Sequence, residues 1–226
     1  MPAIMQIQNS TVRLVALSLP LALIASCHEP ASQTAAQVAS SDEQDAFIAA
    51  LSSHCGKAFA GRLVSDDAVD AVFVDAAMIM HVSECSSDRV AIPFHVQLNG
   101  KWDRSRTWLI TRTDTGLRLK HDHRHEDGKP DAVTMYGGDT KDNGSAGEQA
   151  FPVDAESIAM FEREGLAASV TNVWTVEVDA AGSEPATFAY QLKRTLEGGA
   201  PEPRHFRVEF DLTEPVEVPP PAWGWE

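Results

Sequence analysis

The chain has 226 residues, 43% of them hydrophobic, and 33 acidic against 18 basic side chains give a formal net charge of −15. This balance argues against nucleic acid or an anionic lipid surface as a direct partner, because both need clustered Lys and Arg. The acidic excess favours cationic partners or keeps a soluble surface self-repelling. The length allows one domain with a sizeable core plus a linker.

The first 26 residues have the pattern of an export signal. Arg13 supplies the positive charge, and residues 14–26 form an apolar run. This run is shorter than the about 20 residues of a membrane-spanning helix and fits a signal-peptide core of about 7–15 residues. The segment that ends it, Ile24-Ala25-Ser26-Cys27, resembles the lipobox of bacterial lipoproteins.

This resemblance implies cleavage before Cys27, acylation of its thiol and a lipid anchor in the cell envelope. Several acyl chains anchor a protein stably where one is marginal. Because His28 rather than an aspartate follows the cysteine, the resemblance further implies an outer-membrane protein that faces the periplasm. The alternative is a plain secreted protein, cleaved near Ala25 and Ser26, in which Cys27 is incidental.

The mature chain divides into a linker and one domain. Residues 27–40 comprise Cys27 and an Ala/Ser/Gln/Thr-rich stretch, which is typical of a flexible tether. Residues 41–226 are predicted to form a single β-rich domain. It opens with a helix, because Ser41 and Gln44 make a capping-box pattern and the residues that follow are apolar at helical spacing.

Two cysteines remain after the lipobox, Cys55 and Cys85. In an oxidising compartment such a pair most simply forms one disulfide, since the spacing does not suit a redox-active CxxC site. Closing a loop of about 30 residues contributes roughly 3–4 kcal/mol on the chain-entropy model.

Most of the domain alternates between apolar and polar residues, as strands with one buried face do. The clearest strands cover residues 90–98 and 206–212, and the turn Asn99-Gly100 is a strong hairpin signal. Residues 154–164 predict a second, inserted helix. The pattern predicts a mainly β fold, an antiparallel meander barrel of about 8–10 short strands, with a β-sandwich as the alternative.

The leading helix, the Phe59-Ala60-Gly61 strand start and the meander resemble lipocalin-type calycin barrels. The sequence departs from the Gly-x-Trp signature of that family, because Leu63 stands where the tryptophan would be. The resemblance implies a barrel and a ligand cavity, and no family residue is carried over.

The most informative stretch is a row of histidines. At a period of two, Leu117, Leu119, His121, His123 and His125 share one face, and the leucines predict that this face points inward. Adjacent imidazoles would lie about 7 Å apart at the backbone, which suits a metal such as zinc.

The third metal ligand would be His125, or else His81 or an acidic side chain of a neighbouring strand. The same face could instead ligate haem, contact an organic ligand or form a structural polar plug. Three further histidines are predicted outside the row: His95 and His205 exposed on polar strand faces, and His54 capping a helix.

These patterns leave three functions open. The first is a non-catalytic lipoprotein that binds a small apolar or amphipathic ligand in a barrel, contacting Trp108, Tyr136, His121 and His123, with Phe188 and Phe210 also lining the cavity. The second is a zinc-binding protein or metal-dependent enzyme that uses His121, His123 and His125. The third is a structural or assembly lipoprotein with a filled barrel and an exposed apolar patch.

Overall fold

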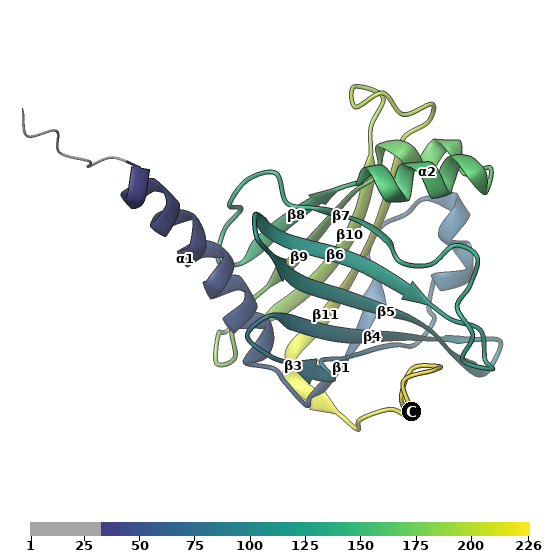
Figure 1. Cartoon of the computed structure of the whole chain (residues 1–226). Coiled ribbons are helices and arrows are strands. Elements are labelled where there is room, and N and C mark those ends of the chain that lie inside the picture. Colours follow the sequence, from purple (N-terminus) through teal and green to yellow (C-terminus); the bar gives the residue numbers. More distant parts are fainter. Residues whose placement is uncertain (1–32) are drawn as a thin grey trace, which may run out of the picture.

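The computed structural model describes the backbone of residues 33–226 and the side chains of residues 42–226 (Figure 1). The predicted signal peptide, Cys27 and the beginning of the predicted linker lie outside these residues. Within them, no helix combines the length and the apolar character needed to cross a bilayer.

The described residues form two α-helices, two short 3-10 helices and a set of antiparallel strands. The helices are α1 (Gln33–Ser52), η1 (Ala68–Phe73), α2 (Ala155–Arg163) and η2 (Ala167–Thr171). The strands are β1 (Ala58–Leu63), β2 (Met78–His81), β3 (Glu84–Cys85), β4 (Arg89–Leu98), β5 (Lys101–Thr113), β6 (Gly116–His123), β7 (Tyr136–Asp139), β8 (Glu148–Pro152), β9 (Val173–Val178), β10 (Thr187–Arg194) and β11 (Arg204–Val216).

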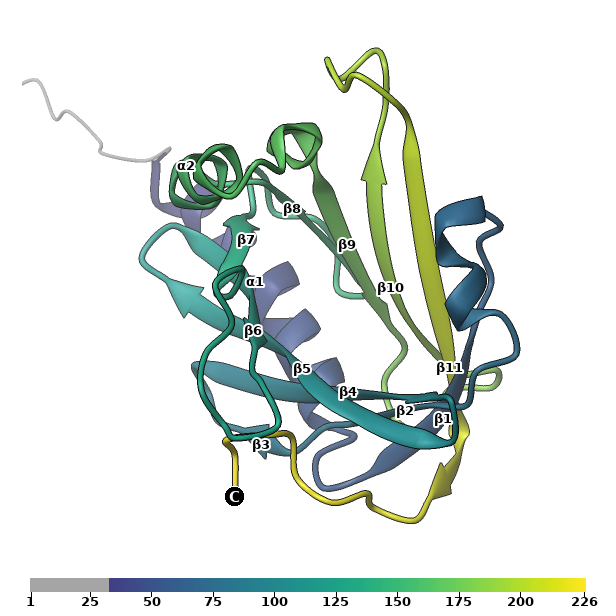
Figure 2. The ribbon, with the colours of Figure 1, turned by 90° about the vertical axis from the view of Figure 1, so that its right-hand side faces the viewer.

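Ten of these strands make a nearly closed meander barrel, as the alternation predicts, and the sandwich alternative is wrong. Their order is β7-β6-β5-β4-β2-β1-β11-β10-β9-β8, with β3 paired to β4 outside this path. Apart from β3, which the ring skips, every neighbour in the ring is also a neighbour along the chain, except that β1 pairs with β11. Figure 2 looks into the barrel, whose strands encircle the interior, with α1 behind them and the blue segment of η1 beside β11.

The barrel has one seam without a full ladder, between β7 and β8. A single bridge joins Gly138 to Val153, and Asp154 donates its N–H to the carbonyl of Gly137 at 3.0 Å. The backbones approach so closely that a Cβ on Gly138 would lie 1.8 Å from the carbonyl oxygen of Pro152. Glycine is therefore required where the sheet closes.

The inward residues of the strands and the end of α1 build one hydrophobic core. Phe47 and Leu51 of α1 are completely buried and close one end of the barrel. On the outside, α2 begins with Asp154 as its N-cap, and Ser157 accepts a hydrogen bond from the N–H of Gly137 at 2.8 Å. The inserted helix thereby packs against β7, beside the seam.

The leading helix differs from the expected one. It begins at Gln33, before the predicted start at Ser41, because the Ala- and Gln-rich residues ahead of Ser41 are good helix formers. Gln44 lies inside the helix and donates to the hydroxyl of Thr140 at 3.3 Å, so it does not complete a capping box. The disulfide between Cys55 and Cys85 is confirmed and links the segment after α1 to β3.

The prediction that His95 is exposed is wrong. Its side chain is only 1% exposed, although it lies on the outer face of β4. The chain after β11 runs back across this side of the barrel, where Trp223 donates its N–H to the carbonyl of Arg104 and Ala222 is buried. Neither ring nitrogen of His95 has a hydrogen-bond partner among the described residues. Burial, Arg104 and His81 lower its pKa to about 4.

Unlike His95, both His54 and His205 have a hydrogen-bond partner. His54 does not cap its helix, because its ring is buried against Phe59 and its Nε2 lies 2.7 Å from the carbonyl oxygen of Asp179. His205 is half-buried, and its Nε2 lies 3.0 Å from Oε1 of Gln191 on the neighbouring strand.

Candidate functional site

A cavity opens at the end of the barrel away from α1. It has a volume of about 180 Å³ and lies where the inward faces of β4, β5, β6, β10 and β11 end in aromatic and polar residues. The lining residues are Asp70, Phe73, Phe94, Arg106, Trp108, His121, His123, Tyr136, Tyr190, Leu192, Arg204 and Phe206. Four of the predicted ligand contacts, Trp108, Tyr136, His121 and His123, are among them.

A second hollow of about 300 Å³ adjoins the cavity on the side of η2 and α2. The two share His123, Tyr136, Tyr190 and Leu192 as lining residues. The shared side chains lie between the two spaces, so a ligand that moves them can reach both.

His121 is the most deeply buried polar group of the site. Its Nδ1 lies 3.0 Å from the carbonyl oxygen of Tyr136, and its Nε2 lies 2.7 Å from the hydroxyl of Tyr190 on the opposite wall. Complete burial lowers its pKa to about 3, so the ring is neutral at ordinary pH. Both nitrogens already have partners, and a metal or a haem iron would have to displace one of them.

His123 lies nearer the opening and pairs with the second tyrosine. Its Nε2 is 3.2 Å from the hydroxyl of Tyr136. Burial and the charge of Arg106 lower the pKa of His123 to about 4, while burial raises the pKa of Tyr136 to about 12. Both groups are therefore neutral at ordinary pH.

His125 lies away from this pair, because β6 ends at His123 and the side chain of His125 is 60% exposed. Its nearest acidic group is Asp131, 3.8 Å away. Across residues 42–226, no three or more His, Cys, Asp or Glu side chains gather in a group that could hold a metal ion. Of the three histidines predicted as metal ligands, His121 and His123 thus lie together in the cavity, and His125 lies outside it.

Aromatic rings form most of the cavity wall. Trp108 stacks on Phe94 with ring centres 4.8 Å apart and on Tyr190 at 4.4 Å. Tyr136 stacks on His121 at 4.5 Å. These stacked arrangements hold each ring in a fixed orientation, so the wall is formed before any ligand arrives.

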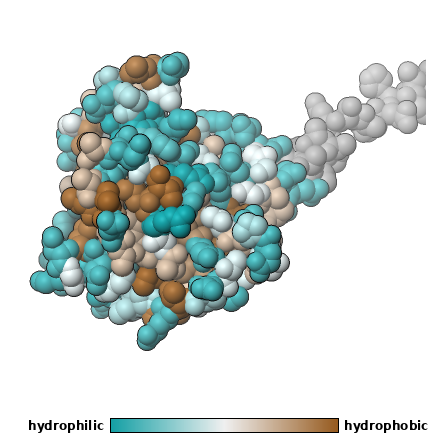
Figure 3. All heavy atoms as spheres, turned by 180° about the vertical axis from the view of Figure 1, so that it is seen from behind, coloured by the Kyte–Doolittle hydropathy of each residue, from teal (hydrophilic) through white to brown (hydrophobic). Residues whose placement is uncertain are grey.

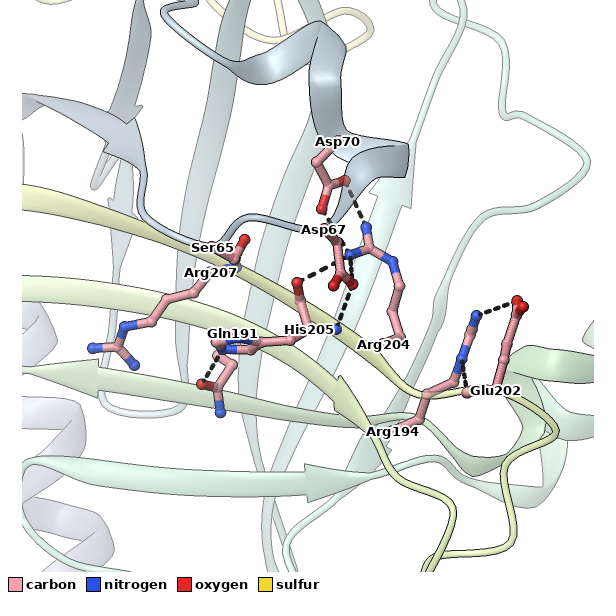
Figure 4. A network of polar contacts seen from close by, with 9 residues as sticks. All are labelled: Ser65, Asp67, Asp70, Gln191, Arg194, Glu202, Arg204, His205 and Arg207. Atoms are coloured by element: carbon pink, nitrogen blue, oxygen red, sulfur yellow. Dashed lines mark hydrogen bonds and ion pairs between the residues drawn. The ribbon is translucent and has the colours of Figure 1, made fainter.

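The 3-10 helix η1 lies at the rim of the cavity, where Asp70 and Phe73 line it, and is held by Arg204 of β11. Asp70 is 2% exposed and receives two hydrogen bonds from the Arg204 guanidinium, at 2.6 and 2.7 Å, which Figure 4 shows. Asp67 accepts from the same guanidinium at 2.7 Å. Phe73 packs edge-on against Phe206 inside the rim, with ring centres 5.7 Å apart.

The charges that line the cavity are paired within the protein. Arg106 bonds to Asp103 at 2.6 Å, and Arg204 bonds to Asp67 and Asp70. The N–H of His205 and the guanidinium of Arg204 together lower the pKa of Asp67, which stays ionised. Apart from the N–H groups of Arg106 that do not face Asp103, the polar atoms left for a ligand belong to neutral tyrosine and histidine side chains.

The outer face of η1 is apolar and open to solvent. Val69, Val72 and Val74 are 73%, 65% and 59% exposed. Seen from behind, hydrophobic side chains gather on this side of the molecule (Figure 3). The segment of η1 thus directs aromatic and acidic side chains toward the cavity and valines toward solvent.

Sequence patterns also missed part of the site. Tyr190, Arg106 and Arg204 were not predicted as site residues, and the available signal was their position on the apolar faces of alternating strands. Conversely, Phe188 and Phe210, predicted to line the cavity, are buried in the filled part of the core.

The fold and site together define a nearly closed antiparallel barrel with an aromatic cavity at one end, an architecture compatible with calycin-like barrels. No protein-family model matches the sequence, and neither a curated protein nor a solved structure matches it. The function therefore has to be argued from the site.

Proposed function

We propose that this protein is an envelope lipoprotein that binds a small apolar or amphipathic ligand in the barrel without transforming it chemically. The observation that carries the proposal is the cavity of about 180 Å³, lined largely by aromatic side chains and a few neutral polar groups. A concave, mostly apolar space with few convergent polar groups is the usual form of a small-molecule site.

The size of the cavity limits the ligand. An engineered apolar cavity of about 150 Å³ in another protein takes up benzene. The present cavity of about 180 Å³ therefore suits a single ring with a small substituent. A larger ligand would have to enter the adjoining hollow of about 300 Å³ as well, by moving Tyr136 or Leu192.

The envelope location is supported by two features. The lipobox-like Ile24-Ala25-Ser26-Cys27 supplies the anchor, and the Cys55–Cys85 disulfide suits an oxidising compartment. On this proposal the segment before α1 connects the barrel to its lipid anchor in the outer membrane.

Native mass spectrometry tests the binding function. All ten barrel strands, the disulfide and the core, which begins at Phe47, lie after Cys27, so the protein can be exported behind a leader without an acylated cysteine. We expect an added organic mass on the folded protein. Leu192→Trp, which would fill the space shared by the two hollows, should lose that mass, whereas Leu196→Trp at an exposed position should keep it.

Two results would oppose the proposal. A bare polypeptide mass, together with no binding of any small aromatic compound, would remove the ligand function. An added mass of zinc that disappears in His121→Ala with His123→Ala would instead favour the metal-binding alternative.

A further inference from the structure

The hydrogen bonds of His121 fix which of its nitrogens carries the proton. The carbonyl oxygen of Tyr136 can only accept, so Nδ1, 3.0 Å away, must be the N–H that donates to it. A neutral imidazole has one N–H, and its other nitrogen is then an acceptor. Nε2 of His121 is therefore unprotonated.

This tautomer fixes the direction of the next hydrogen bond. The hydroxyl of Tyr190 lies 2.7 Å from Nε2 of His121 and must donate its proton there. Burial keeps His121 neutral, with a pKa of about 3, so the arrangement persists across the ordinary pH range. The Tyr190 oxygen has no second proton, and toward a ligand it can act only as an acceptor.

The paired charges limit the ligand further. Arg106 is bonded to Asp103, and Arg204 to Asp67 and Asp70. A charged ligand would lose its hydration on entry without meeting an uncompensated opposite charge, which is costly in a buried site. The cavity thus suits a neutral molecule.

Resting on the ligand-binding function proposed above, we propose that the cavity selects neutral aromatic molecules that carry an O–H or N–H donor, such as phenols and NH-heterocycles. The ring fills the aromatic space beside Trp108, and the donor binds the oxygen of Tyr190. The His121 imidazole acts through Tyr190 as a positioning residue.

The tautomer is tested without any ligand. Long-range ¹H–¹⁵N spectra of the folded protein should show His121 protonated at Nδ1 and unprotonated at Nε2. A ring protonated at Nε2 would overturn the inference, because Tyr190 would then accept from His121 and its proton would be free to donate to a ligand.

Selectivity is tested by titrating the exported protein with phenol, anisole and toluene, using calorimetry. Water solvates phenol better than anisole, so a plain apolar cavity should prefer anisole. The inference predicts the opposite order, with phenol bound about tenfold more tightly than anisole, since anisole leaves the Tyr190 acceptor unpaired.

A double variant provides the matched comparison. His121→Leu with Tyr190→Phe removes both polar partners together, and it should prefer anisole. Gln191→Leu, on the outer face of the same strand, should keep the wild-type preference for phenol. Equal or tighter binding of anisole to the wild-type protein would overturn the selectivity, whereas no binding of all three compounds would oppose the binding function itself.

Discussion

Tyr190 donates a hydrogen bond to His121 across the interior of the barrel, between strands β10 and β6, which are not neighbours in the sheet. The two residues are 69 positions apart in the chain, and both are buried. The bond therefore ties opposite walls together at the base of the cavity, and its loss should be measurable as stability.

We expect His121→Leu to lower the free energy of unfolding by about 1–3 kcal/mol, because it leaves the Tyr190 hydroxyl unpaired in the interior. Tyr190→Phe should cost a similar amount by leaving Nε2 of His121 unpaired. The double variant should cost clearly less than the sum of the two, and urea denaturation measures all three. Strict additivity would show that the two side chains do not interact in solution.

Arg204→Met should destabilise the protein by about 3–5 kcal/mol, since it leaves the buried Asp70 carboxylate without its partner. Arg194→Met is the matched control. Arg194 pairs with Glu202, which is 70% exposed, and such surface pairs contribute about 0–1 kcal/mol. Equal losses of stability in Arg204→Met and Arg194→Met, measured by thermal denaturation, would mean that Asp70 is not buried in the folded protein.

His95 should make stability depend on pH. Its pKa is lowered to about 4 in the folded protein from an ordinary value of 6.5, so the unfolded chain binds the proton more tightly. The contribution of His95 to the free energy of unfolding therefore falls as the pH drops from about 6.5 toward 4, by about 1.4 kcal/mol per pH unit.

His95→Leu should flatten that acid loss and raise stability at pH 7, because two buried nitrogens without partners are removed. His125→Leu, at an exposed position, is the control for the loss of a histidine elsewhere. The test is the urea midpoint measured between pH 7 and 4.5. If the midpoint of His95→Leu depends on pH as steeply as that of the wild-type protein, His95 is not the source of the acid loss.

The seam between β7 and β8 should not tolerate a side chain. We expect Gly138→Ala to cost about 1–3 kcal/mol, because its Cβ would overlap the carbonyl oxygen of Pro152 and force the strands apart. Gly147→Ala is the control, since its Cβ would meet its nearest atom at an ordinary 3.5 Å. Similar midpoints for the two variants in thermal unfolding would show that the seam is looser than described.

The proposed lipid anchor is tested at Cys27. Cys27→Ser should abolish incorporation of labelled fatty acid, and the domain should lose its firm attachment to the outer membrane. Cys55→Ser together with Cys85→Ser should leave the labelling intact. Labelled fatty acid on the Cys27→Ser protein would show that the lipobox resemblance is misleading.

The fold could be predicted because period-two alternation is a local signal. Residues 206–212 show it clearly, and a hydrophobic face of that kind has to be buried whatever the neighbouring strand is. The direction of the histidine row followed from Leu117 and Leu119 in the same way. The end of β6 at His123 had no comparable signal, so His125 was placed in the row although it lies outside.

The rest of the site depends on contacts that only the closed barrel creates. Tyr190 meets His121 because the ring brings β10 opposite β6, and no spacing in the sequence indicates that encounter. His95 was expected to be exposed because its own strand alternates, but it is buried on the side of the barrel where the chain after β11 bonds to Arg104. The segment around η1 (Ala68–Phe73), which supplies Asp70 and Phe73 to the cavity, shows no clear period in the sequence.

On the export route proposed above, the pairing of β1 with β11 has a consequence for the order in which strands pair. A chain that crosses a membrane from its N-terminus can pair β1 with β2 early, but the other edge of β1 has no partner until residues 204–216 arrive. Such a long-range contact is slow to form. Any product that stops before β11 keeps the edges of β1 and β10 open, and open edges of this kind recruit strands from other molecules.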